Sequence, residues 1–243
     1  MEIPIIFYFL LFVVAFLYSS VGHGGASGYL ALMALFNFAP EVMKPTALLL
    51  NIFVSMIAFI QYYRSGYFHW KLFFPFALAS IPLSFLGGMI HIGGDIYKQI
   101  LGILLLFPVI RFIGFGNKEV AVTRPVQLYW ALLIGGIIGL LSGMIGIGGG
   151  IILSPILLLL HWANQKEAAA VSAAFIFVNS VSGLSGQLVQ NVEFNQNMFF
   201  FAAIAFAGGI AGSYLGSHRF NMLVLKRILG FVLLIASIKL LTV

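Results

Sequence analysis

Two glycine-rich clusters are the part of this sequence best suited to bind a ligand. The first contains Gly22, His23, Gly24 and Gly25, and the second contains Gly146, Gly148, Gly149 and Gly150. Each cluster precedes a short apolar segment, so its glycines stand at the N-terminus of a predicted short helix. The first N–H groups of a helix have no acceptor within the helix and carry partial positive charge. Because glycine lets a ligand approach these groups closely, the clusters predict an anion site built from the backbone.

Three kinds of polar side chain accompany the clusters. His23 lies inside the first cluster, where it could donate to an anion, carry a coupled proton or be structural, and Ser27 follows closely. The second cluster has Ile147 in place of the histidine, so this role would belong to one half only. Asn51 and Asn179 lie midway along later apolar segments, where an amide either contacts substrate or joins helices.

Other kinds of chemistry find little support. The chain has no cysteine, which excludes thiol catalysis, thiolate metal sites and disulfides. No apolar segment contains a cluster of His, Asp and Glu, and no Ser–His pair on separate helices is identifiable, so a metal site or an intramembrane protease is disfavoured. The net charge of +6 comes without a Lys/Arg run, which argues against a nucleic-acid partner. We expect no cofactor.

The elements that must position the clusters are membrane helices. Hydrophobic residues make up 62% of the chain and charged residues 7%, against roughly a quarter in a soluble domain. Helices satisfy their own backbone groups in lipid, and many apolar runs here suit about 30 Å of hydrocarbon. The expected segments are 4–20, 27–39, 45–63, 72–90 and 99–115, then 128–142, 151–161, 168–189, 198–216 and 223–241.

The two halves of the chain repeat one another. The glycine clusters correspond, and so do Asn51 and Asn179. Residues 80–87 match 209–216, and residues 98–102 match 226–230. The four matches occur in the same order and lie between 124 and 129 positions apart. The sequence therefore predicts repeats at 1–115 and 127–243, joined by a cytoplasmic linker at 116–126.

The positive charges predict how the segments around each cluster cross the membrane. If each pair of segments turns back to its starting side, nine Lys and Arg residues lie on one side and three on the other; if each pair crosses once, the division is six and six. The nine are Arg64, Lys71, Arg111, Lys118, Arg124, Lys166, Arg219, Lys226 and Arg227, and the three are Lys44, Lys98 and Lys239. Cytoplasmic loops carry an excess of Lys and Arg, so the pairs are expected to turn back. Each half then crosses an odd number of times, and the second half is inverted relative to the first.

The glycines have a second interpretation, which is close packing between helices. We favour packing for six glycines outside the clusters: Gly87, Gly88, Gly208, Gly209, Gly212 and Gly216. For the two clusters we favour anion binding, because they recur and interrupt long apolar segments.

The pattern from Gly146 to Gly150 followed by Pro155, repeated loosely at Gly22–Gly25, resembles the sulfite exporter TauE/SafE family. The resemblance covers the whole chain and includes the stretch GYFHWK at residues 66–71. It implies movement, chiefly export, of sulfite, sulfonates and related small anions, with the cluster glycines in contact with substrate. The first half departs from the pattern, because Ala26 stands opposite Gly150 and Ala31 opposite Pro155.

These observations together predict an all-α polytopic membrane protein of two inverted repeats. Each repeat is a glycine-broken helical hairpin followed by three transmembrane helices. The expected function is a secondary transporter of small sulfur-containing anions in the inner membrane, with both termini outside and a possible coupling proton. A passive anion channel remains the alternative.

Overall fold

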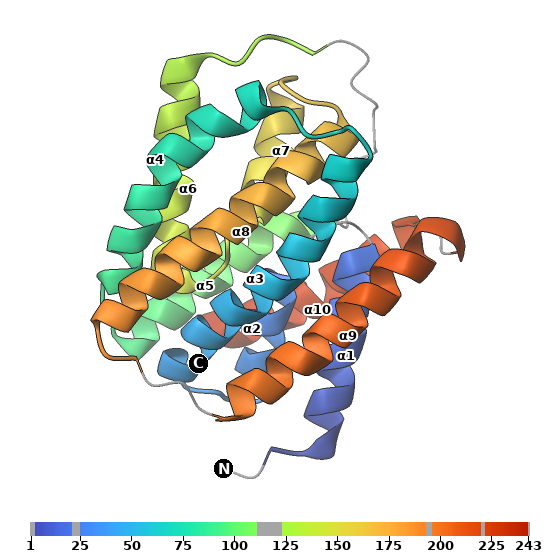
Figure 1. Cartoon of the computed structure of the whole chain (residues 1–243). Helices are drawn as coiled ribbons and strands as arrows, with labels where there is room; N and C mark the ends of the chain where they lie inside the picture. The colour runs from blue at the N-terminus through green and yellow to red at the C-terminus, as the bar shows by residue number, and fades with distance from the viewer. Residues whose placement is uncertain (1–2, 21–24, 111–122, 193–195, 220–221, 243) are drawn as a thin grey trace.

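The computed structural model describes residues 3–20, 25–110, 123–192, 196–219 and 222–242, and between 213 and 226 it describes the backbone alone. These ranges contain ten α-helices and no strand (Figure 1). The first five are α1 (Ile5–Ser20), α2 (Ala26–Leu35), α3 (Pro40–Arg64), α4 (Trp70–Met89) and α5 (Gly94–Val109). The second five are α6 (Leu128–Ile145), α7 (Gly150–Leu159), α8 (Gln165–Val189), α9 (Gln196–Arg219) and α10 (Met222–Thr242).

Four of the described helices are long and apolar enough to cross a membrane: α3, α4, α6 and α8. Large apolar side chains on their outer faces are exposed, among them Phe74, Leu78 and Ile137. In water this exposure would be costly, but next to lipid it is the favourable arrangement. The all-helical, multi-pass membrane architecture predicted from composition is confirmed.

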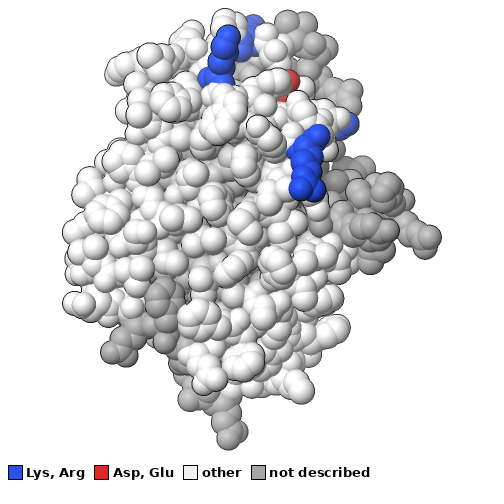
Figure 2. Space-filling model, viewed as in Figure 1, with Lys and Arg blue, Asp and Glu red and all other residues white. Residues whose placement is uncertain are grey.

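Charged side chains gather at the two ends of the molecule. We call one end the basic end, because it holds Arg64, Lys71, Arg124 and Lys166. The other is the terminal end, where α1, α3 and α5 begin and α10 ends (Figure 1); Lys44 lies in the first turns of α3, Lys98 in the first turns of α5 and Lys239 in the last turn of α10. In Figure 2 the blue and red side chains lie in the upper part of the visible face, and the described surface below them is white. Arg111 and Lys118 lie outside the described residues, and the side chains of Arg219 and Lys226 do so too. Arg227, the ninth residue assigned to the cytoplasm, is an exposed residue in the first turns of α10.

The helices pack through glycines that lie directly on neighbouring backbone. Gly135, Gly139 and Gly143 of α6 meet the backbone of Phe76, Ser80 and Ser84 of α4, one helical turn after another. Gly208 and Gly212 of α9 meet α1 in the same way, at Phe12 and Phe16. Any side chain at these glycines would separate the helices, as in other small-residue membrane interfaces.

The predicted packing role is confirmed for four glycines outside the clusters: Gly87, Gly88, Gly208 and Gly212. At Gly209 the nearest atoms would be 3.5 Å from an added Cβ, so its contact is looser. The contacts of Gly216 lie outside what the structure describes.

Each glycine cluster joins two helices that turn back on one another. Phe7 near the start of α1 stacks on Phe38, which follows α2, with ring centroids 5.0 Å apart. At the open end of the second hairpin, the N–H of Arg124 donates to the carbonyl of His161 over 2.6 Å. In both hairpins the chain therefore returns to the level at which it entered.

Several helix boundaries differ from the prediction for local reasons. The short helices α2 and α7 end at residues 35 and 159 rather than 39 and 161, because Asn37 and His161 adopt the left-handed conformation that terminates a helix. Helix α3 starts at residue 40 rather than 45, with Pro40 at its first position. Helix α8 starts at residue 165 rather than 168, because Asn164 and Glu167 form a capping box.

The two halves of the chain use the same series of helices. In order, their lengths are 16, 10, 25, 20 and 16 residues in the first half and 18, 10, 25, 24 and 21 in the second. The two long helices α3 and α8 pack against each other and run in opposite directions (Figure 1). Helix α1 packs on α9 and α6 packs on α4, so each half completes the other.

Candidate functional site

The second glycine cluster forms a turn that is buried throughout. Gly146, Gly148 and Gly149 have φ values of 88°, 74° and 76°, a region that residues with side chains rarely adopt. Gly149 precedes α7 and offers no side-chain cap to it. The first N–H groups of α7 therefore have no side-chain acceptor from Gly149, and their partial positive charge lies inside the protein.

Asn51 of α3 lies directly beside this turn. An added Cβ on Gly148 would be 2.8 Å from Nδ2 of Asn51 and 3.3 Å from Oγ of Ser180. Asn51 is fully buried, and neither its Nδ2 nor its Oδ1 has a hydrogen-bond partner; the Ser180 hydroxyl also has none. Leaving such groups unpaired costs about 1–3 kcal/mol each, so they are the atoms that a polar ligand would satisfy.

The start of α2 has the same backbone arrangement but a different lining. Gly25 has a φ of 82°, precedes α2 and provides no side-chain cap. Around it lie the hydroxyls of Tyr18 and Ser27, whose oxygens are 2.7 Å apart, and the buried, unpaired hydroxyl of Tyr29. An added Cβ on Gly25 would be 2.6 Å from the Tyr29 ring, so this residue, too, must be glycine.

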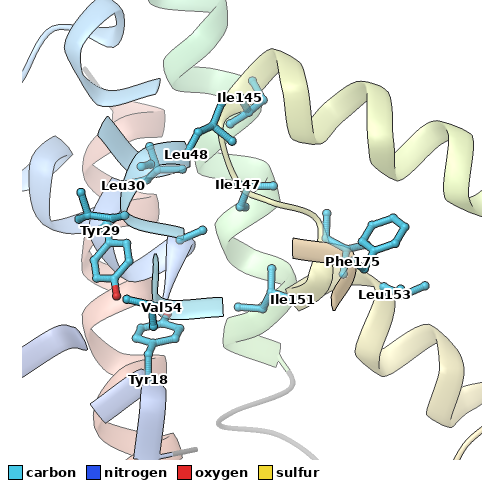
Figure 3. Packing of buried hydrophobic residues seen from close by; sticks show 14 of the residues in the cluster. Tyr18, Tyr29, Leu30, Leu48, Val54, Ile145, Ile147, Ile151, Leu153 and Phe175 are labelled. Atoms are coloured by element: carbon cyan, nitrogen blue, oxygen red, sulfur yellow. The ribbon is translucent and has the colours of Figure 1, made fainter. Parts of the chain in front are cut away.

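The two hairpin tips share a small cavity. Tyr18, Gly25, Ala26 and Ser27 line it from the first hairpin, Ile147 and Ile151 from the second, and Ile176 from α8. Figure 3 shows Ile147 and Ile151 along the second turn and Tyr18 and Tyr29 on the first hairpin. The cavity has room for about one water-sized group, and none of the described side chains that line it is charged.

The remaining predicted residues are placed as follows. Gly146 ends α6 against the backbone carbonyl of Lys44, and Gly150 begins α7 beside Ile176 and the carbonyl of Ser172. Asn179 is fully buried; its Nδ2 donates to the carbonyl of Phe175 over 2.8 Å, and its Oδ1 is unpaired. Gly22, His23 and Gly24 lie outside the described residues.

The outer end of α2 is anchored by a lysine from the other half. Lys239 of α10 donates to the carbonyls of Ala34 and Leu35, at 3.1 and 2.8 Å, and to Oδ1 of Asn37 at 2.8 Å. A cation at the C-terminus of a helix complements its dipole. The inner, N-terminal end of α2 has no corresponding side-chain cap from Gly25, so its positive pole faces the cavity.

Four polar residues at these tips were not predicted from the sequence: Tyr18, Tyr29, Ser172 and Ser180. Tyrosines in a membrane protein mostly mark the membrane interface, and serines commonly join helices, so composition alone could not distinguish them. The sequence signal that could have identified some of them was their closeness in sequence to the predicted site residues. Tyr18 and Tyr29 flank the first cluster, and Ser180 follows Asn179 directly.

Comparison with known proteins decides what class of protein contains this arrangement. A sequence profile described as sulfite exporter TauE/SafE matches residues 7–240. The chain belongs to the TauE/SafE family. It is therefore a membrane transporter of a small-molecule substrate and not an enzyme.

Relatives of this TauE/SafE chain occur in bacteria, archaea and plants. "Probable membrane transporter protein y4hK" of Sinorhizobium fredii is 36% identical over 235 residues, which cover 95% of each chain. "Probable membrane transporter protein MJ0441" of Methanocaldococcus jannaschii is 30% identical over 75% of this chain and 71% of the relative. "Sulfite exporter TauE/SafE family protein 1" of Arabidopsis thaliana is 32% identical over 41% of this chain and 20% of its own length. No solved structure matches this family member.

Proposed function

We propose that the protein is a secondary transporter, acting as an exporter, of small sulfur-containing oxyanions such as sulfite or organosulfonates. The anion is held at the N-termini of α2 and α7, in the middle of the membrane, where the cavity between them must widen to admit more than a water-sized group. The observation that carries this proposal is the shared cavity, because both glycine-started helices reach it from opposite halves of the chain. The family name and that of the Arabidopsis relative support sulfite as the first substrate to test.

The site stabilises an anion without a fixed positive charge. A buried, unpaired anion would cost several kcal/mol. Each half-helix N-terminus contributes up to about 2 kcal/mol, and each hydrogen bond to a charged group about 1.5–3 kcal/mol. The amide of Asn51 and the hydroxyls of Ser180 and Tyr29 supply further donors. Together these terms offset the desolvation while leaving the affinity moderate enough for release.

The two halves are proposed to be inverted repeats that give alternating access. In support, exchanging the halves maps the contact of α1 with α9 onto that of α6 with α4, and α2 with α10 onto α7 with α5. Left-handed backbone positions also recur at matching places: Gly25 and Gly149, Asn37 and His161, and Gly66 and Asn191. The opposite directions of α3 and α8 are those that inversion requires (Figure 1).

The basic end is proposed to face the cytoplasm, which places both termini outside the inner membrane. Four of the nine basic residues assigned to the cytoplasm lie at this end, and the three assigned outside lie at the terminal end. Reporter fusions at the two chain ends test this orientation. A cytoplasmic signal from either fusion would reject it.

His23 is proposed to contribute a donor or a coupled proton at the same cavity. Its counterpart in the second half is Ile147, whose buried side chain lines the cavity. The proposal rests on the position of His23 in the sequence, within the first glycine cluster. A histidine side chain can take up and release a proton, whereas that of Ile147 cannot.

Transport by the purified protein in proteoliposomes tests the function directly. We expect radiolabelled sulfite and an organosulfonate to exchange across the membrane, with sulfate and a monocarboxylate exchanging more slowly. Accumulation against a gradient, driven by an imposed proton gradient, would distinguish a coupled transporter from a passive channel. If carboxylates moved faster than both sulfur anions, the proposed substrate class would be wrong.

A further inference from the structure

A second, larger cavity opens near the terminal end of the molecule. It has a volume of about 570 Å³ and lies among the first turns of α3, the end of α4 with the segment that follows it, and the end of α8. We call it the vestibule. Among the residues that line it, Glu41, Lys44 and His91 bear charged or titratable groups, and Gln187 bears a buried amide.

Gln187 is the residue of the vestibule that most needs a ligand. Its side chain is only 2% exposed, and neither Nε2 nor Oε1 has a hydrogen-bond partner. Buried amides are normally hydrogen-bonded, and an exception calls for an explanation. A rotation of the side chain toward the vestibule, which Gln187 lines, would let Nε2 donate to an oxyanion or a bridging water there.

Lys44 supplies the positive charge. Its ammonium donates to the backbone carbonyl of Ile90 over 3.1 Å, which uses one of three N–H donors. Among the described residues its ammonium forms no ion pair, even with Glu41 one turn away on α3. Two donors of a half-buried cation therefore remain for an anion.

The vestibule also adjoins the second glycine turn. The backbone carbonyl of Lys44 would be 2.9 Å from an added Cβ on Gly146. Tyr97, which lines the vestibule, donates from its hydroxyl to the carbonyl of Ile145 over 2.9 Å. Gly146, two residues before Gly148, thus lies beside the vestibule. An anion that leaves Gly148 toward the terminal end would enter the vestibule there.

We propose that the vestibule is a second anion site, in which the ammonium of Lys44 and the amide of Gln187 bind an oxyanion between the central cavity and the solvent. The inference deepens the proposed function and rests on it for the direction of travel. The binding itself can be tested without transport.

The test uses the natural absence of cysteine from the chain. Gln190 is an exposed residue that lines the vestibule, and the variant Gln190→Cys of the full-length protein would be modified with two methanethiosulfonate reagents of opposite charge. The rate of each reagent is divided by its rate with a free thiol in solution. We expect this relative rate to be several-fold higher for the anionic reagent than for the cationic one. Methanesulfonate at millimolar concentration, a chemically inert anion, should slow both reactions.

Three further variants of the same cysteine protein complete the test. Lys44→Gln should remove the charge preference, and Gln187→Leu should remove protection by methanesulfonate. Lys98→Gln, at the same end of the molecule but outside the vestibule, should change neither, and thermal unfolding would verify that all three fold. Equal relative rates in the parent protein, or an equal effect of Lys98→Gln, would overturn the proposal.

Failure of the central site would look different. Gly148→Val should abolish transport but leave the charge preference at residue 190 intact. A chain that transports no sulfur oxyanion yet keeps the preference and the protection would retain the vestibule and lose the proposed function. A chain that transports sulfur oxyanions but shows no charge preference at residue 190 would retain the proposed function and lose the vestibule site.

Discussion

The starts of α2 and α7 have the same backbone and different surroundings. Both helices are ten residues long, and both follow a left-handed glycine that provides no side-chain cap. At α7 the nearby polar groups are an amide and a hydroxyl without partners, from Asn51 and Ser180. At α2 they are hydroxyls, two of which, on Tyr18 and Ser27, already bond to each other.

This difference suggests different contributions of the two helix starts to the proposed anion binding. In the proposed site both halves present the N-terminus of a short helix, whose partial positive charge would attract an anion of any shape. The side chains differ, and those at α7 are the less satisfied by the protein itself. We infer that α7 and Asn51 contribute more of the binding free energy, whereas α2 with its tyrosines contributes more to selection.

The largest effect is expected from Gly148→Val. The new side chain would contact the Asn51 amide and Ile176 and would block the N-terminus of α7, so binding of sulfite should weaken more than ten-fold. Equilibrium binding to the purified protein measures this loss.

Gly66→Val is its matched control. Gly66 has a similar φ of 76°, but an added Cβ there would meet nothing within 4 Å. The substitution should therefore only strain the backbone and lower the free energy of unfolding by about 1–3 kcal/mol, and sulfite binding should stay unchanged. Equal losses of affinity in the two variants would show that backbone strain, and not the site, explains the effect.

The next effect compares the two asparagines. Asn51→Leu should weaken binding about ten-fold, because it removes two unpaired polar atoms beside Gly148. It should also leave the free energy of unfolding unchanged or raise it by about 1 kcal/mol, since an unsatisfied buried amide is lost. Asn179→Leu, which breaks a hydrogen bond to Phe175, should lower stability more and affinity less. The opposite ranking would show that Asn179, and not Asn51, contributes the amide that binds the anion.

His23→Gln is expected to have an intermediate effect. Glutamine keeps a hydrogen-bond donor and removes the titrating group. The transport rate should fall several-fold at low pH, and its variation between about pH 5 and 8 should flatten. A pH profile measured in proteoliposomes provides the comparison. If rate and profile both match those of the parent, His23 has a structural role only.

The smallest effect is expected from Tyr29→Phe. The hydroxyl is buried and unpaired, so its removal should not lower stability, and affinity for sulfite should fall no more than about three-fold. Its contribution to selection should be visible as a change in the ratio of sulfite to sulfonate binding. Ser180→Ala is the corresponding change at α7, and a larger shift of that ratio there would reverse the roles assigned to the two halves.

Most of the fold could be predicted because apolar runs and charges report directly on membrane helices. All ten segments were found in order. The errors lay at ends that hydropathy does not register: a proline that starts α3, a capping box before α8, and left-handed residues after α2 and α7.

The site was predictable only as far as its backbone. Glycine clusters identify a turn wherever they occur, and residues 25, 146, 148 and 149 adopt the left-handed conformation. Which side chains surround the turns depends on how α3 and α8 cross, and sequence spacing does not determine that crossing. The unpaired state of Gln187 could not be predicted either, because every glutamine looks alike until its neighbours are known.

The contact of α1 with α9 has a consequence for biosynthesis. Phe16 packs against Gly212, which is synthesised 196 residues later in the chain. At about 5–20 residues per second, the ribosome needs roughly 10–40 s to deliver that partner. Throughout this time the nascent first hairpin stands in the bilayer with its packing face uncovered. A ribosome that stalls in the second half therefore leaves an incomplete protein in which the face of α1 that packs on α9 stays uncovered.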